Sequence, residues 1–312
     1  MESVAVTIRV CLPIYIMIAV GYAANRRGIV SRPTLKELNA GVFRIFLPLL
    51  LFENMYTSHL DVTNIKALLF AVASVILIFL ICHVVVFHVI GTKSRAATIV
   101  QGMYRSNFAL LGIALTETLY GSGETDVTGM LVAVIIPLYN VLAVILFESS
   151  CQNGKTKIGK IVKGILKNPL ILWTCTGLVL NLLHITIPVA VNSVVTSLGQ
   201  VATPLALFVM GGNFEAAKTK KNRNPLIAVS TTRLIIIPIL CTAMSIILGF
   251  RGKSLYALFL MYATPTAVAS YAMASSMGGD EDLAGEIVLV TTAISMVSIG
   301  LGVYVLTALR LI

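Results

Sequence analysis

Residues 103–121 read MYRSNFALLGIALTETLYG, and a related stretch, MYATPTAVASYAMASSMGG, returns 158 residues later at residues 261–279. Five residues recur at the same spacing: Met103, Tyr104, Ala109, Ala114 and Gly121 match Met261, Tyr262, Ala267, Ala272 and Gly279. Each copy is long enough to cross a bilayer, because a spanning helix needs about 20 residues. The pair therefore predicts two equivalent membrane-spanning helices.

Both copies carry polar or helix-breaking residues early in the span. In the first copy these are Arg105, Ser106 and Asn107, and in the second they are Thr264, Pro265 and Thr266. A broken helix is tolerated inside a bilayer only where protein or a water-filled cavity covers it. Two interrupted helices at matching places in two halves of a chain indicate a transporter's binding site. We therefore expect these two helices to be broken and to cross each other.

The composition is unlike that of a soluble domain. Of the 312 residues, 57% are hydrophobic and 12% are charged, whereas soluble domains have about 25% charged residues. Hydrophobic runs predict ten spans, at residues 7–24, 38–56, 66–90, 96–120, 128–147, 162–183, 191–213, 226–250, 254–277 and 283–309. The predicted fold class is an all-α polytopic membrane protein with ten transmembrane helices, of which the fourth and ninth are broken.

The basic residues predict how these spans are oriented. Most of the 23 Lys and Arg residues fall in loops on one side of the ten spans. Loops rich in Lys and Arg stay cytoplasmic, so residues 151–167 should form a cytoplasmic basic loop, with both termini outside the cell membrane. The same rule explains the net charge of +10 without a nucleic acid partner. The run from Lys155 to Lys167 is interpreted as such an anchor or as a contact with anionic membrane lipid.

Further landmarks repeat along the chain at an offset of 156 residues. The matching pairs are Pro13 with Pro169, Gly21 with Gly177, and PLLLF at residues 48–52 with PLALF at residues 204–208. Five spans per half is an odd number, so the second half should be inserted upside down relative to the first. Residues 1–150 and 168–312 are therefore predicted to be two inverted five-helix repeats.

The interrupted helices can form an anion site. The start of each second half-helix has free N–H groups and carries roughly half a positive charge. Asn107 can bond a freed carbonyl or a carboxylate, or cap its helix without a ligand. Pro265 lacks an N–H and opens its helix, or only kinks it. The predicted substrate-binding residues are Arg105, Ser106, Asn107, Thr264, Pro265, Thr266 and Ser270.

Ionisable residues within a membrane indicate function by default. Arg105 could hold a carboxylate as a bidentate pair, or its side chain could snorkel to the cytoplasmic interface. Arg44 and Arg233 are expected to snorkel or to pair between helices. Glu117 and His83 are candidates for proton coupling, with a solvated rim position and a hydrogen-bonded bundle position as the alternatives. No spacing typical of a metal site or an enzyme motif occurs, so we predict no metal, cofactor or catalytic residue.

Five motifs resemble the auxin efflux carrier family, whose bacterial branch includes malate and malonate permeases. They are LPIYIMIAVGYAANRRGIVS, FRIFLPLLLF, YRSNFALLG, GQVATPLALFVMGG and ATPTAVASYAMASSMGGD, which begin at residues 12, 43, 104, 199 and 263. The absence of the long central loop of many plant members makes the chain more similar to the bacterial branch. One departure is Ile113 after Gly112, where many relatives have a proline.

The resemblance implies the helix arrangement shared with bile acid sodium symporters. Spans one, two, six and seven would form a scaffold, and spans three to five and eight to ten a transport domain. It also implies a carboxylate site at the crossing, with Asn107 as the crossover asparagine and Pro265 as the crossover proline. Because plant relatives are dimers, a homodimer is expected.

The function expected from these observations is secondary active transport of a small organic anion by alternating access. A mono- or dicarboxylate such as malate is the expected substrate. Sodium-coupled anion symport is the alternative within transport. A non-transporting membrane receptor and a membrane enzyme are the alternatives from other classes.

Overall fold

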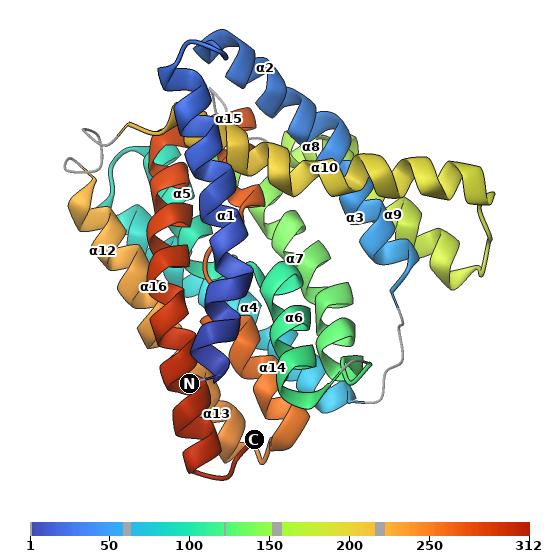
Figure 1. The fold of residues 1–312 in the computed structure, drawn as a ribbon, viewed down its shortest axis with the longest axis vertical. Coiled ribbons are helices and arrows are strands. Elements are labelled where there is room, and N and C mark those ends of the chain that lie inside the picture. The colour runs from blue at the N-terminus through green and yellow to red at the C-terminus, as the bar shows by residue number, and fades with distance from the viewer. Residues whose placement is uncertain (1, 59–63, 122, 152–157, 216–221) are drawn as a thin grey trace.

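A computed structural model describes residues 2–58, 64–121, 123–151, 158–215 and 222–312, and the elements in these ranges are helices. In chain order they are α1 (Glu2–Arg26), α2 (Arg32–Gly41), the π-helical turn η1 (Val42–Phe46), α3 (Leu47–Tyr56), α4 (Ile65–Val89), α5 (Lys93–Tyr104), α6 (Phe108–Tyr120), α7 (Asp126–Ser150), α8 (Ile158–Lys167), α9 (Pro169–Leu182), α10 (Val189–Asn213), α12 (Arg223–Thr231), the π-helical turn η2 (Thr232–Ile236), α13 (Ile237–Ile247), α14 (Gly252–Ala263), α15 (Ala269–Ser276) and α16 (Glu281–Ala308). Figure 1 shows that α1 begins and α16 ends at the same end of the molecule.

Five of the described helical segments are long and apolar enough to cross a membrane. They are α4, α7, α10, the continuous segment Arg223–Ile247 and α16. Their outer faces carry large apolar side chains, such as Val84 on α4 and Tyr304 on α16, which are 68% and 72% exposed. Apolar surface of this extent is not left in water. The helical content and these spans agree with the predicted all-α membrane class.

The predicted sixth span, residues 162–183, is wrong as a single helix. The structure divides it at Asn168, whose Oδ1 accepts a hydrogen bond of 2.9 Å from the Leu170 N–H and caps α9. Pro169 occupies the first turn of α9, a position that suits proline because no intrahelical N–H bond is lost there. Helix α8 begins within residues 151–167, the segment that is predicted to be a cytoplasmic basic loop. Lys155 lies outside the described residues.

Helices α1 and α10 pack closely, as do α3 and α9. A Cβ atom added to Gly21 of α1 would overlap the carbonyl group of Phe208 on α10. A Cβ atom added to Gly177 of α9 would overlap the carbonyl group of Phe52 on α3. Small residues allow helix backbones to approach this closely in membranes. The two contacts are reciprocal, because the sequence repeat matches Gly21 with Gly177 and Phe52 with Phe208.

Two helices are interrupted at the places that the sequence predicts. Residues 105–107 separate α5 from α6, and residues 264–268 separate α14 from α15. The interruptions lie against each other as an isolated antiparallel bridge between Ser106 and Thr266. The Asn107 N–H donates to the Pro265 carbonyl at 2.7 Å, and the Ala267 N–H donates to the Arg105 carbonyl at 3.4 Å. We call residues 105–107 and 264–268 together the junction.

Candidate functional site

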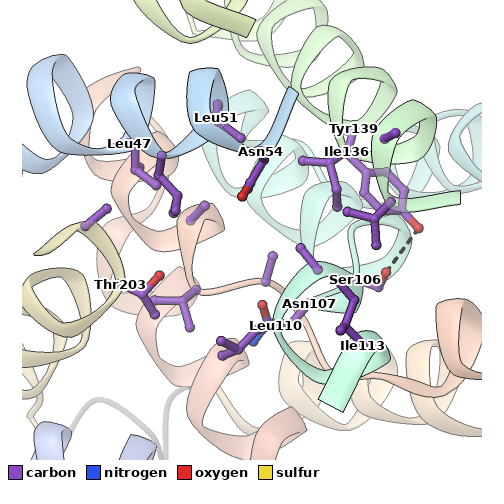
Figure 2. A pocket seen from close by; sticks show the side chains of 18 of the residues that line it. Leu47, Leu51, Asn54, Ser106, Asn107, Leu110, Ile113, Ile136, Tyr139 and Thr203 are labelled. Carbon is purple, nitrogen blue, oxygen red and sulfur yellow. Dashed lines mark hydrogen bonds between the residues drawn. The ribbon is translucent and has the colours of Figure 1, made fainter. Parts of the chain in front are cut away.

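A cleft with a volume of about 640 Å³ lies beside the junction. In Figure 2, side chains of three helices surround those at the start of α6. They are Leu47, Leu51 and Asn54 of α3, Ile136 and Tyr139 of α7, and Thr203 of α10. The side chains at the start of α6 are Ser106 and Asn107, which precede the helix, and Leu110 and Ile113 within it. Small-molecule sites typically have volumes of about 300–1,000 Å³, so the cleft has the size of a ligand site.

The walls of the cleft are mostly apolar, with a smaller set of polar groups. Leu47, Leu51 and Ile136 are among the apolar lining residues, and Asn54 and Thr203 are among the polar ones. The lining also includes Thr57 and Asp126, which are exposed. These residues lie just after α3 and at the first position of α7, so the cleft is bounded there by exposed polar groups. An apolar cleft with a few placed polar groups suits an organic ligand.

Arg105 lines the cleft and is only 4% exposed. Its Nη2 donates to Oδ1 of Asn140 on α7 at 2.6 Å, and its Nη1 donates to Sδ of Met273 on α15 at 2.7 Å. A guanidinium has five N–H donors, and a thioether sulfur is a weak acceptor. The ion pairs found among the described residues do not include Arg105. Arg105 therefore does not snorkel to the surface, and its charge is not balanced by a described carboxylate.

Two amide groups near Arg105 also have unused donors. Asn107 precedes α6 and makes no side-chain capping bond to it. Its Nδ2 is buried and has no hydrogen-bond partner among the described residues, and the same holds for Nδ2 of Asn140, a residue that is 1% exposed. The first turn of α6 adds N–H groups that have no intrahelical partner. This side of the junction therefore has more donors than acceptors.

The second interruption presents different groups to the cleft. Ala267 and Val268 line it, whereas Thr264, Pro265, Thr266 and Ser270 are not among its lining residues. The Thr266 hydroxyl donates to the Gly102 carbonyl at 2.8 Å, and the Thr266 N–H donates to Oγ1 of Thr291 at 3.2 Å. Of the seven predicted substrate-binding residues, the structure thus places Arg105, Ser106 and Asn107 on the cleft and leaves the other four out of its lining.

The two candidates for proton coupling lie away from the cleft. Glu117 is exposed on α6. His83 on α4 lies between the rings of Phe79 and Phe87, with centroid distances of 5.9 and 4.4 Å. Neither residue is among those that line the cleft. The structure therefore does not bring Glu117 and His83 together with the residues of the junction.

Sequence reasoning missed two residues around the junction. Tyr139 shares a hydrogen bond of 3.2 Å between its hydroxyl and that of Ser106, drawn as a dashed line in Figure 2. Asn140 receives the hydrogen bond from Arg105, and its polarity within the apolar α7 segment was the available signal. For Arg233, an exposed fraction of 1% excludes the first of its two expected alternatives, snorkelling, whereas Arg44 is exposed. Arg233 bonds between helices instead, as the alternative expectation stated.

Comparison with known proteins shows the family of the chain. Residues 6–302 match the family described as "Membrane transport protein". An uncharacterized transporter of Methanothermobacter thermautotrophicus is 23% identical over 309 residues, which cover 93% of this chain and 95% of that protein. The mouse lysosomal cholesterol signaling protein is 26% identical over 242 residues, which cover 72% of this chain and 28% of that protein. The match confirms the resemblance: the chain belongs to the membrane transport protein family, an auxin efflux carrier-like family of membrane transporters.

Proposed function

We propose that this protein is a secondary active transporter of a small organic anion, a mono- or dicarboxylate such as malate. The observation that carries the proposal is the excess of hydrogen-bond donors beside the cleft. Arg105 and Asn107, which line the cleft, offer donors, and no described ion pair supplies a carboxylate to Arg105. A carboxylate has two oxygens with about four acceptor positions, and it would use these donors.

The electrostatics of the cleft favour the same ligand. The start of α6 carries roughly half a positive charge, and Arg105 adds a full one. Water is largely excluded around Arg105, which is 4% exposed. A hydrogen bond to a charged group contributes about 1.5–3 kcal/mol under such conditions. These contributions support selective binding of anions over neutral solutes.

The walls of the cleft narrow the substrate class. Leu47, Leu51, Leu110, Ile113 and Ile136 would contact the body of a ligand whose carboxylate is near Arg105. Apolar contacts of this kind stabilise by about 25 cal/mol per Å² of buried surface. A carboxylate with an apolar body would therefore bind more tightly than malate, which exposes hydroxyl and carboxylate groups along its length.

We also propose that the ten predicted spans form an inverted repeat that moves by alternating access. The reciprocal contacts of Gly21 and Gly177 support a two-fold relation between the halves. One wall of the cleft comes from α3 and α10, which would belong to the scaffold, and the opposite wall from α6 and α7, which would belong to the transport domain. A substrate between two such groups of helices can be exposed alternately to the two sides. The topology would place both termini outside the cell membrane.

Sodium-coupled symport is a second candidate, favoured by three buried oxygens of residues that do not line the cleft. Gln101 Oε1, Thr264 Oγ1 and Ser270 Oγ have no hydrogen-bond partner among the described residues. Hard cations prefer oxygen ligands of this type. Replacement of sodium by potassium during transport measurements separates the two candidates, because only symport requires sodium.

The function is tested with purified protein in lipid vesicles. A thermal-shift screen of mono- and dicarboxylic acids identifies ligands first, since a ligand at 100 times its Kd stabilises by about 2.7 kcal/mol. Radiolabelled counterflow of malate and of the best ligand should then be saturable and absent from empty vesicles. Binding without counterflow would support a receptor, and chemical conversion of the acid would support an enzyme; either result would contradict the proposal.

A further inference from the structure

Arg233 is a buried charge that the anion site does not use directly. It lies in the π-helical turn η2, is 1% exposed, and is not among the residues that line the cleft. A buried guanidinium is costly unless other groups bond to it and balance its charge. The described ion pairs give Arg233 no carboxylate. Its partners must therefore be found elsewhere.

The partners of Arg233 are three backbone carbonyls at the junction. Its Nε donates to the Thr264 carbonyl at 3.0 Å, its Nη2 to the Met261 carbonyl at 2.9 Å, and its Nη1 to the Tyr104 carbonyl at 3.4 Å. Tyr104 ends α5, Met261 lies in the last turn of α14, and Thr264 follows α14. An interrupted helix leaves the carbonyls of its last turn without intrahelical partners. Arg233 therefore bonds to carbonyls that both interruptions have freed.

The charge of Arg233 also matches the helix ends that it contacts. The carbonyl end of a helix carries roughly half a negative charge, so the ends of α5 and α14 together carry about one. The guanidinium supplies one positive charge at that place. The positive starts of α6 and α15 and the charge of Arg105 then remain beside the cleft, where no described ion pair gives Arg105 a carboxylate. Arg233 and Arg105 thus have separate electrostatic partners, although both are buried near the junction.

We propose that Arg233 is the positioning residue of the anion site. It holds the ends of α5 and α14 together and cancels their negative charge, and so raises the affinity of a site that it does not touch. The part that concerns affinity rests on the proposed transport of an organic anion. The part that concerns the junction is independent of any ligand.

The test uses the full-length protein with Arg233→Met and Arg233→Lys, and with Arg44→Met as a control in the other π-helical turn, where the arginine is exposed. Hydrogen exchange is measured for peptides covering residues 103–110 and 263–270, and for a scaffold peptide covering residues 195–205. In Arg233→Met, exchange of both junction peptides should rise about tenfold, because the bonds that hold the interruptions together are lost. The scaffold peptide and the Arg44→Met variant should stay near wild type.

Affinity is measured in the same variants by calorimetry with succinate and butyrate, which have four carbons each and carry two charges and one. A coulombic contribution scales with ligand charge, so Arg233→Met should weaken succinate about tenfold and butyrate about threefold. Arg233→Lys keeps the charge, and succinate affinity should stay within about threefold of wild type. Its junction peptides should nevertheless exchange faster, because an ammonium lacks the fork that reaches three carbonyls.

Two results would overturn the proposal. One is unchanged exchange of the junction peptides in Arg233→Met. The other is an equal loss of succinate and butyrate affinity without rescue by lysine, which is what a merely structural residue would give. If Arg233→Met does not fold, hydrogen exchange of the junction peptides in Arg233→Lys tests the proposal instead. Protection of these peptides equal to wild type would refute the positioning role of Arg233. Failure of the wild-type protein to bind either acid would contradict the proposed substrate class, whereas the exchange measurement would still decide the role of Arg233.

Discussion

The first interruption, residues 105–107, and the second, residues 264–268, occupy matching places in the two halves but contribute differently to the cleft. The first presents Arg105, Ser106 and Asn107. The second presents Ala267 and Val268, while the residues that carry its hydroxyl groups do not line the cleft. The repeat thus gives both halves an interrupted helix, whereas the ligand-binding chemistry is concentrated in one of them.

Hydrogen bonding explains why the second interruption offers so little to a ligand. Thr266 uses its hydroxyl on Gly102 and its N–H on Thr291, and the Pro265 carbonyl accepts from Asn107. These bonds satisfy groups that the broken helices would otherwise leave open. The second interruption therefore supports the first, which keeps its donors free. Three predictions test this division, and the second uses substitutions at matched places in the two halves.

The largest loss of substrate affinity is expected for Arg105→Gln. Loss of a charged hydrogen bond to the substrate should cost about 2–3 kcal/mol, or roughly 30–150-fold in affinity. The exposed Arg44, changed to Gln, is the control and should leave affinity unchanged. Titration of malate binding at matched protein quality measures both variants. If the Arg105→Gln variant binds malate with wild-type affinity, Arg105 is not part of the anion site, and no charged donor of the cleft would then be assigned to the substrate.

The next prediction concerns stability at two positions where the halves remain alike, and we expect the same loss of stability at both. Gly21→Ala and Gly177→Ala would each force a Cβ atom against a carbonyl group of a neighbouring helix. Overpacking of this kind costs about 1–3 kcal/mol, so both variants should have lower melting temperatures by a similar amount. Malate affinity should not change, since neither residue lines the cleft.

Gly91→Ala is the control for the glycine pair, because a Cβ atom there has open space. A loss of stability at only one of Gly21 and Gly177 would contradict the two-fold relation between the scaffold contacts. The division between a symmetric scaffold and an asymmetric junction would then have to be abandoned.

The interruptions were predictable because their signals are local. Proline and clusters of polar residues stand inside otherwise apolar spans, and the repeat marks them twice. The division of the sixth span was also encoded locally, in Asn168 followed by Pro169, but the apolar residues on both sides outweighed that signal. A helix cap and a proline at the first turn are reliable indications of a new helix start.

The roles of the arginines were not predictable, because their partners are distant in sequence. Arg105 bonds to residues 35 and 168 positions away, and Arg233 to carbonyls 28, 31 and 129 positions away. A sequence pattern shows that a charge lies within a span, but snorkelling and burial follow from the tertiary contacts. The alternatives for Arg105 therefore stayed open until the positions of Asn140 and Met273 were known.

The smallest change in affinity is expected when one side chain from each half of the junction region is removed. Nδ2 of Asn107 and Oγ of Ser270 are both buried and lack a hydrogen-bond partner in the part of the chain that the structure describes, but only Asn107 lines the cleft. Loss of a neutral hydrogen bond to a ligand costs about 1 kcal/mol, so Asn107→Ala should weaken malate binding about fivefold. Ser270→Ala should stay within about twofold of wild type, since Ser270 has no direct access to the ligand. Neither change should lower the melting temperature much, because neither removes a described side-chain bond.

Titration of both variants and of their combination separates the outcomes. An equal loss in the two single variants would mean that both halves contribute equally to binding. An unchanged affinity in Asn107→Ala would mean that this asparagine serves only the helix start.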